Sequence, residues 1–168
     1  MKKVFIINGA AGVGKDTFVE IVRSILTETT NLGTYNISSV DNVKIAAKIL
    51  GWDNKKDEKG RKFLSDLKDL SSLNYNGPYR YLYFETMSIK EGFVFLHTRE
   101  PDEISYFVEN YPANVKTILI TRNNVETFNN HADKNVADYN YDITIDNSTT
   151  IEDFTQLIKQ FIIKELEA

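Results

Sequence analysis

Short apolar runs alternate with longer segments of helical periodicity, and this alternation limits the fold more than any other feature. The apolar runs of strand length are residues 4–7, 35–38, 93–96, 117–120 and 143–145. Apolar residues recur at helical spacing in segments 15–28, 42–50, 57–73, 78–89, 101–109 and 151–166. Strands separated by helices pair in parallel through right-handed crossovers. The sequence therefore predicts a single three-layer α/β/α domain over residues 1–168, built on a five-stranded parallel sheet.

The strongest local motif directly follows the first apolar run, where a parallel sheet places its ligands. Residues 9–17 read Gly-Ala-Ala-Gly-Val-Gly-Lys-Asp-Thr, which is a GxxxxGK pattern. Glycines let the backbone curl with its N–H groups pointing inward, and the helix that begins near Lys15 adds its positive dipole end. We expect Lys15 to reach the β- and γ-phosphates of a nucleotide. The expected phosphate-binding residues are Gly9, Gly12, Val13, Gly14, Lys15, Asp16 and Thr17.

Asp16 departs from the common form of this motif. Phosphate loops usually carry Ser or Thr at this position, and its hydroxyl binds Mg²⁺. A carboxylate in the first helical turn is favoured by the dipole, but it faces a polyanion unless a metal or water lies between them. Two interpretations stay open. Either Asp16 or Thr17 serves Mg²⁺, directly or through water, or Asp16 only caps the helix.

The loop ending in Gly-Lys-Asp-Thr resembles those of deoxynucleotide monophosphate kinases, and phosphomevalonate kinase carries a similar loop. Both belong to the nucleoside monophosphate kinase group of P-loop proteins. The resemblance implies a phosphotransferase that uses ATP and Mg²⁺ and phosphorylates a nucleoside or deoxynucleoside monophosphate. Three alternatives stay open: a kinase of another small metabolite, such as phosphomevalonate or dephospho-coenzyme A, an ATP-binding regulatory protein, or a structural module without a nucleotide.

The third apolar run leads into His97-Thr98-Arg99-Glu100-Pro101-Asp102-Glu103. This segment is similar to the strand end of deoxynucleotide kinases, where an acidic residue is followed by Arg two positions later and Glu four beyond. Arg99 and Glu103 match that pattern, whereas His97 stands at the acidic position. The resemblance implies that Arg99 binds the acceptor and assists catalysis. The alternative is an ion pair between Arg99 and Glu103 on one helix face.

Residues 41–90 correspond, by the same resemblance, to the arm that grips the acceptor. Arg61 and Arg80 would hold the acceptor phosphate through paired guanidinium contacts. Helical spacing also predicts a stripe of buried side chains on the arm. We expect at most one of the aromatic residues between positions 75 and 84 to stack on the base of the acceptor. The residues of the predicted stripe are Phe63, Leu64, Leu67 and Leu70.

Residues 123–140 correspond to the lid that closes over the phosphates and excludes water. Arg122, at its start, would contact ATP or the transferring phosphoryl group. His131-Ala132-Asp133 resembles a short His-x-Ser-Glu element of the deoxynucleotide kinases. Asp146-Asn147 either lies beside the adenine, as the related turn does, or forms a plain turn.

Composition excludes several other classes of protein. The chain has no Cys, only two widely spaced His, and 20 basic against 24 acidic side chains, for a formal net charge of −4. Thiolate chemistry and a Cys-ligated zinc site are therefore excluded, and a nucleic-acid polymer is not the expected partner. The apolar run 4–7 is shorter than a signal core of about 7–15 residues, and no segment approaches the roughly 20 apolar residues of a membrane span. We expect a cytoplasmic protein with a small-molecule partner, either monomeric or dimeric.

Overall fold

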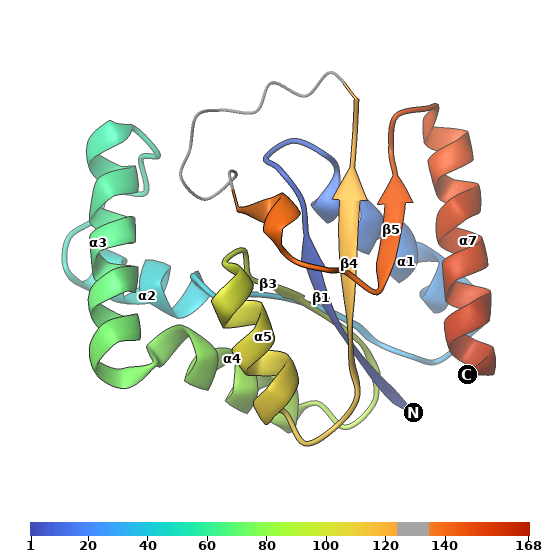
Figure 1. The fold of residues 1–168 in the computed structure, drawn as a ribbon, viewed down its shortest axis with the longest axis horizontal. Helices are drawn as coiled ribbons and strands as arrows, with labels where there is room; N and C mark the ends of the chain where they lie inside the picture. The colour runs from blue at the N-terminus through green and yellow to red at the C-terminus, as the bar shows by residue number, and fades with distance from the viewer. Residues whose placement is uncertain (124–134) are drawn as a thin grey trace.

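The computed structural model describes residues 1–123 and 135–168 and has three layers around one sheet (Figure 1). All neighbouring strands pair in parallel, in the order β2-β3-β1-β4-β5. Each predicted apolar run lies inside a strand, so the predicted five-stranded parallel sheet is confirmed. The strands are β1 (Lys2–Asn8), β2 (Thr34–Ser38), β3 (Gly92–His97), β4 (Val115–Thr121) and β5 (Ile143–Asp146).

The central strand β1 is buried on both faces, which explains why it reads as a continuous apolar run. Phe5 and Ile7 pack in one core cluster with α1 (Lys15–Thr29) and α7 (Ile151–Glu167). Val4 and Ile6 pack in a second cluster, on the other face, with α4 (Gly77–Ser88) and α5 (Pro101–Asn110). Aromatic rings fill much of the first cluster, where Phe5 stacks on Phe95 of β3 with ring centroids 5.2 Å apart. The sheet is therefore rigid on both sides of the strand that leads into the glycine motif.

Three helices connect β2 to β3, and they occupy the segment predicted to be the arm. These are α2 (Asp41–Ile49), α3 (Glu58–Tyr75) and α4. Asp57 caps α3 by accepting a hydrogen bond from the Gly60 N–H at 2.8 Å. Asn76, with φ of 50°, ends α3 and turns the chain directly into α4.

The long helix α3 lies at the margin of the molecule (Figure 1). It packs on α2 and α4 rather than against the sheet. Phe63, Leu64 and Leu67 are accordingly only partly buried, and Leu70 is 61% exposed. The prediction that Leu70 belongs to a buried stripe was wrong, because helical periodicity marks a face but not what covers it.

After the undescribed residues, the chain resumes in a short 3₁₀ helix, η1 (Val136–Asp138), before β5. No helix in the two described ranges is both long and apolar enough to cross a bilayer.

A partly buried ion pair joins α7 to the sheet. The side chain of Glu165 is completely buried, and both of its carboxylate oxygens accept hydrogen bonds from Lys116 Nζ of β4, at 2.7 and 2.8 Å. Removing one partner of such a pair leaves an uncompensated charge inside the protein.

We predict that Lys116→Met lowers the free energy of unfolding by about 3 kcal/mol, because it leaves Glu165 buried and unpaired. The double variant Lys116→Met/Glu165→Leu should recover most of the loss, since it removes both charges. Urea unfolding at pH 7 measures both. A double variant no more stable than the single one would contradict this account.

Candidate functional site

The glycine motif after β1 forms a tight loop that only glycine can build. Gly9 and Gly14 have φ of 146° and 100°, which side chains rarely adopt. Space is also lacking: a Cβ at Gly9 would lie 2.4 Å from the carbonyl oxygen of Ile120. A Cβ at Gly14 would lie 2.5 Å from Nδ2 of Asn147. The loop backbone is therefore pressed against the ends of β4 and β5.

Lys15 begins α1 and folds its ammonium group back over this loop. Its Nζ donates to the carbonyl oxygens of Gly9 at 2.6 Å and Ala10 at 2.8 Å. The positive charge and the N-terminal amides of α1 thus lie on the same loop, as phosphate binding requires. The residues present fit a nucleotide polyphosphate.

Asp16 and Thr17 lie exposed on the first turn of α1, beside Lys15. Among the described residues, no group of three or more His, Cys, Asp or Glu side chains could hold a metal ion by itself. One or two protein ligands nevertheless suit Mg²⁺, because this ion commonly takes its remaining ligands from phosphates and water. The oxygen donors of Asp16 and Thr17 therefore fit a magnesium ion held jointly with a nucleotide.

Two asparagines fix the ends of the loop. Asn8, at the end of β1, accepts from the Gly9 N–H at 2.8 Å and donates to the Arg99 carbonyl at 3.1 Å and the Tyr141 hydroxyl at 2.7 Å. The Tyr141 hydroxyl donates onward to the Val136 carbonyl at 2.9 Å, and burial raises its pKa to about 12. Tyr141 is therefore neutral at physiological pH. Asn8 joins the phosphate loop to the Arg99 segment and to the chain that precedes β5.

Asn147 fixes the other end of the loop, because its Nδ2 donates to the Val13 carbonyl at 2.9 Å. The backbone N–H of Asn147 donates to the Thr121 carbonyl at 2.8 Å. The segment after β5 is therefore part of the loop's support, which gives Asn147 a role beyond that of a plain turn residue.

Glu103, at the start of α5, links that helix to β3 and to α3. It accepts a hydrogen bond from the Thr98 hydroxyl at 2.8 Å. It also forms an ion pair with Lys68 of α3 at 2.8 Å. Arg99 lies before α5, which begins at Pro101, so Arg99 and Glu103 do not share a helix face. Lys68 thus connects α3, through Glu103, to the carboxyl end of β3, next to the Arg99 segment.

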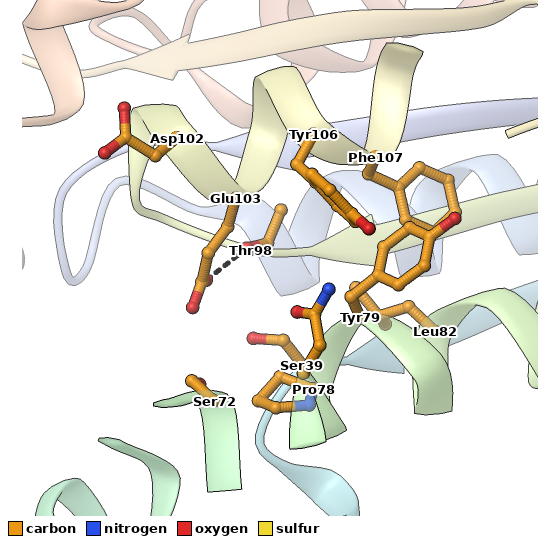
Figure 2. Close-up of a pocket in the computed structure, with 11 residues that line it drawn as sticks. Ser39, Ser72, Pro78, Tyr79, Leu82, Thr98, Asp102, Glu103, Tyr106 and Phe107 are labelled. Atoms are coloured by element: carbon orange, nitrogen blue, oxygen red, sulfur yellow. Dashed lines mark hydrogen bonds between the residues drawn. The ribbon is translucent and has the colours of Figure 1, made fainter. Parts of the chain in front are cut away.

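A cavity of about 180 Å³ opens between α3, α4 and α5 at the carboxyl ends of β2 and β3 (Figure 2). Figure 2 shows Thr98 and Glu103 on one side of it and Ser39 and Ser72 on the other, with the rings of Tyr79, Tyr106 and Phe107 at one end. None of its lining residues in the described chain carries a positive charge. The lining residues are Ser39, Ser72, Asn76, Pro78, Tyr79, Leu82, Thr98, Asp102, Glu103, Tyr106 and Phe107.

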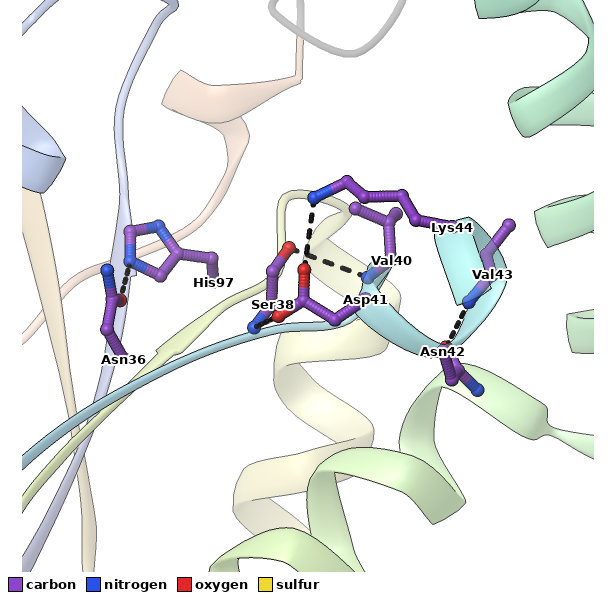
Figure 3. Close-up of polar contacts among 8 residues, drawn as sticks. All are labelled: Asn36, Ser38, Val40, Asp41, Asn42, Val43, Lys44 and His97. Atoms are coloured by element: carbon purple, nitrogen blue, oxygen red, sulfur yellow. Dashed lines mark hydrogen bonds and ion pairs between the residues drawn. The ribbon is translucent and has the colours of Figure 1, made fainter. Parts of the chain in front are cut away.

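His97 ends β3 between the phosphate loop and the end of β2. Its Nε2 lies 2.5 Å from Oδ1 of Asn36 (Figure 3). Burial lowers the pKa of His97 to about 4; Asp16 opposes this shift and Lys15 adds to it. His97 is therefore a neutral imidazole at physiological pH and brings no positive charge to a phosphate.

Asp41 lies near His97 at the start of α2, and its carboxylate also tends to raise the His97 pKa. It accepts from the Ser38 N–H at 2.8 Å and forms an ion pair with Lys44 at 3.0 Å (Figure 3). The carboxyl end of β2 therefore presents a carboxylate fixed by two partners.

The remaining predicted arginines lie apart from the cavity. Arg61 is exposed near the start of α3, where its Nε donates to the Lys56 carbonyl at 2.7 Å. Arg80 is exposed on α4 and lines a separate hollow with Asn110. Arg122 is exposed just after β4, on the same sheet edge as the phosphate loop. The predicted lid element His131–Asp133 lies outside the described residues.

Comparison with known proteins identifies the fold. No family model and no curated protein matches the sequence. Among solved structures, the chain is similar to dephospho-CoA kinase from Campylobacter jejuni, with a TM-score of 0.51 and 18% identity over 97% of both chains. A sugar kinase from Janibacter gives a TM-score of 0.51 and 13% identity, over 96% of this chain and 95% of that one. At these identities the likeness concerns the fold alone, and the chain has the P-loop kinase fold.

The sequence pattern did not single out most residues of the cavity. Ser39 follows β2, Ser72 lies in α3 and Tyr106 lies in α5, and none stands in a recognisable motif. The contact between Asn8 and Tyr141 was also missed, because these two residues lie 133 positions apart along the chain. The only available signal was position, since Ser39 and Thr98 directly follow strands whose carboxyl ends share one edge of the sheet.

His97 makes stability depend on pH in a defined direction. Its folded pKa of about 4 lies below the ordinary value of 6.5, so the unfolded chain binds a proton between these two values and the folded chain does not. We predict that the wild type loses about 2 kcal/mol more unfolding free energy than His97→Gln when the pH falls from 7 to 4.5. Urea unfolding at the two pH values measures this difference. Equal losses in the two proteins would contradict a buried neutral His97.

Proposed function

We propose that this protein is an ATP-dependent phosphotransferase that phosphorylates a nucleoside or deoxynucleoside monophosphate. One observation carries the proposal: the phosphate loop and the cavity follow neighbouring strands. The loop follows β1, the cavity opens at the ends of β2 and β3, and β3 lies directly beside β1. Arg99 lies between them, with its carbonyl bonded to Asn8 at the start of the loop. A donor phosphate and an acceptor can therefore meet at Arg99.

In this proposal the loop binds the phosphates of ATP. The amides of Gly12, Val13 and Gly14 would face the polyphosphate, whereas the Gly9 amide is held by Asn8, and Lys15 would exchange its carbonyl contacts for phosphate oxygens. Thr17 or Asp16 would hold Mg²⁺, which would offset the charge of the phosphates. The similarity of the fold to the P-loop kinases supports this assignment.

Transfer needs positioning and charge compensation rather than a base. An acceptor phosphate oxygen is already anionic, so it can attack the γ-phosphorus in line while the bond to the ADP oxygen breaks. Lys15 and Arg99 would offset the charge shared by the entering and leaving oxygens, and Arg122 would add to this from the end of β4. Closure of the proposed lid, residues 123–140, would exclude water and prevent hydrolysis.

We assign the arm, residues 41–90, to the acceptor. The base of the acceptor would enter the cavity, and the acceptor phosphate would face Arg99. Arg61 and Arg80 do not line the cavity. Either could therefore reach the acceptor phosphate only through movement of the arm, so we give the main contact to Arg99.

A kinase that phosphorylates a hydroxyl group of another small metabolite is the second candidate. A hydroxyl acceptor must lose its proton, and the fixed carboxylate of Asp41 at the end of β2 is placed to accept one. The fold likeness to a dephospho-CoA kinase is compatible with this class. Asp41→Asn separates the two: it should abolish transfer to a hydroxyl acceptor, which requires the ionised base, and leave transfer to a phosphate acceptor unchanged.

We predict that Lys15→Ala lowers kcat/KM at least about 100-fold, because it removes a charge that the transition state needs. The measurement is ADP formation from Mg²⁺-ATP with a panel of ribo- and deoxynucleoside monophosphates. The matched control is Lys159→Ala, which removes an exposed lysine from α7, away from the loop. Its turnover should equal that of the wild type.

Unchanged turnover in a folded Lys15→Ala protein would contradict the mechanism. If ATP binds but no monophosphate raises ADP formation, the acceptor assignment is wrong. Dephospho-coenzyme A, whose acceptor is a hydroxyl group, then tests the second candidate, and phosphomevalonate tests a metabolite kinase whose acceptor is a phosphate. Slow ADP formation that no acceptor stimulates would favour an ATP-binding regulatory protein.

A further inference from the structure

The cavity between α3, α4 and α5 has the chemistry of a selective site for one part of an acceptor. Among its lining residues only Glu103 directs a carboxylate toward it, since Figure 2 shows the Asp102 side chain pointing away, and no lysine or arginine of the described chain lines it. A phosphate would find no positively charged lining group there, whereas a neutral group with hydrogen-bond donors would be attracted to Glu103. What enters the cavity is therefore the end of the acceptor opposite its phosphate.

The carboxylate of Glu103 is held in one orientation. Lys68 approaches one oxygen and Thr98 the other, each at 2.8 Å. A carboxylate oxygen has two acceptor positions, so each oxygen can accept one further hydrogen bond from a ligand. Because both existing partners are fixed by the fold, Glu103 presents a preorganised acceptor to the cavity.

Ser72 gives an independent sign that a ligand belongs here. Its hydroxyl oxygen is buried and has no hydrogen-bond partner, and the residue lines the cavity on the side of α3. A buried polar group without a partner is destabilising, so it is normally retained only when something bonds to it. A ligand in the cavity would supply that bond.

Aromatic rings define the shape of the occupant. Tyr79 and Tyr106 meet edge to face, with centroids 4.7 Å apart, and Tyr79 also contacts Phe107. All three rings line the cavity. Flat aromatic surfaces at one end of a small cavity favour a planar heterocycle over a branched or flexible group.

We propose that the cavity selects a base that carries an exocyclic amino group, with Glu103 accepting from that amino group and Ser72 bonding a second polar atom of the same ring. The inference rests on the proposed function, since it names the class of monophosphate that the same site accepts. Neither contact involves the phosphate loop, so selectivity can change while ATP binding stays intact.

Pairs of acceptors that differ at one position test the proposal directly. The wild type should prefer guanosine over inosine monophosphate, or cytidine over uridine monophosphate, by at least about tenfold in kcat/KM, because a fixed, partly buried carboxylate discriminates against a base without a donor. Glu103→Gln should reduce that ratio at least about fivefold, since its amide NH₂ presents a donor in place of an acceptor. The matched control is Glu109→Gln, the same change at an exposed position of the same helix, and it should keep the ratio.

Ser72→Ala tests the site without disturbing a charge. The variant should raise the KM for the preferred monophosphate about three- to tenfold, leave the KM for ATP unchanged, and keep or raise the melting temperature, because an unpartnered buried hydroxyl is removed. A purely structural Ser72 would instead lower the melting temperature and leave both KM values unchanged.

Three results would overturn the proposal, and they differ from one another. Equal use of amino-bearing and amino-lacking bases, with monophosphates still phosphorylated, refutes the inference and keeps the proposed function. A Glu103→Gln effect on the ribose-to-deoxyribose ratio, with the base ratio unchanged, assigns the carboxylate to the sugar and refutes the base contact. Failure of every monophosphate to accept a phosphoryl group overturns the proposed function and this inference with it.

Discussion

The candidate site depends on the left-handed backbone of the loop between β1 and α1. Gly9 and Gly14 adopt φ values that other residues avoid, and each lies too close to a neighbouring strand end for a side chain. The same loop places the carbonyls of Gly9 and Ala10 within hydrogen-bond distance of the Lys15 ammonium. The loop is therefore built before any ligand arrives, and preorganised charge is the main contribution a protein makes to phosphoryl transfer.

Hydrogen bonds connect the preformed loop to the segments that follow the neighbouring strands. Asn8 joins the loop to the Arg99 segment and to Tyr141, and Asn147 joins it to the segment after β5. The region beyond Arg99 differs in charge: the imidazole of His97 is neutral, and no lining residue of the cavity in the described chain is positively charged. The Lys15 ammonium thus lies at the phosphate loop, and the cavity fits an uncharged part of a ligand.

The sequence predicted the features that depend on local pattern, and it missed those that depend on distant contacts. Alternating apolar runs and helical segments defined the parallel sheet, and the GxxxxGK motif located the loop, because both signals lie within a few residues. The exposure of Leu70 was mispredicted, since periodicity cannot show that α3 packs mainly on α2 and α4 and leaves the Leu70 side uncovered. Ser72 and Glu103 come together only after α3 and α5 pack, so no spacing along the chain could reveal their shared cavity.

The most direct test of the central claim is a backbone amide NMR titration with Mg²⁺ and an ATP analogue that has a non-hydrolysable β,γ-bridge. Binding of the polyphosphate in the loop predicts the largest, saturable shifts at Gly12, Gly14, Lys15 and Asp16. The amides of Ser72 and Glu103, which belong to the separate cavity, should move little. Saturable binding that leaves the amides of residues 9–17 unchanged would contradict the assignment of this loop as the phosphate site.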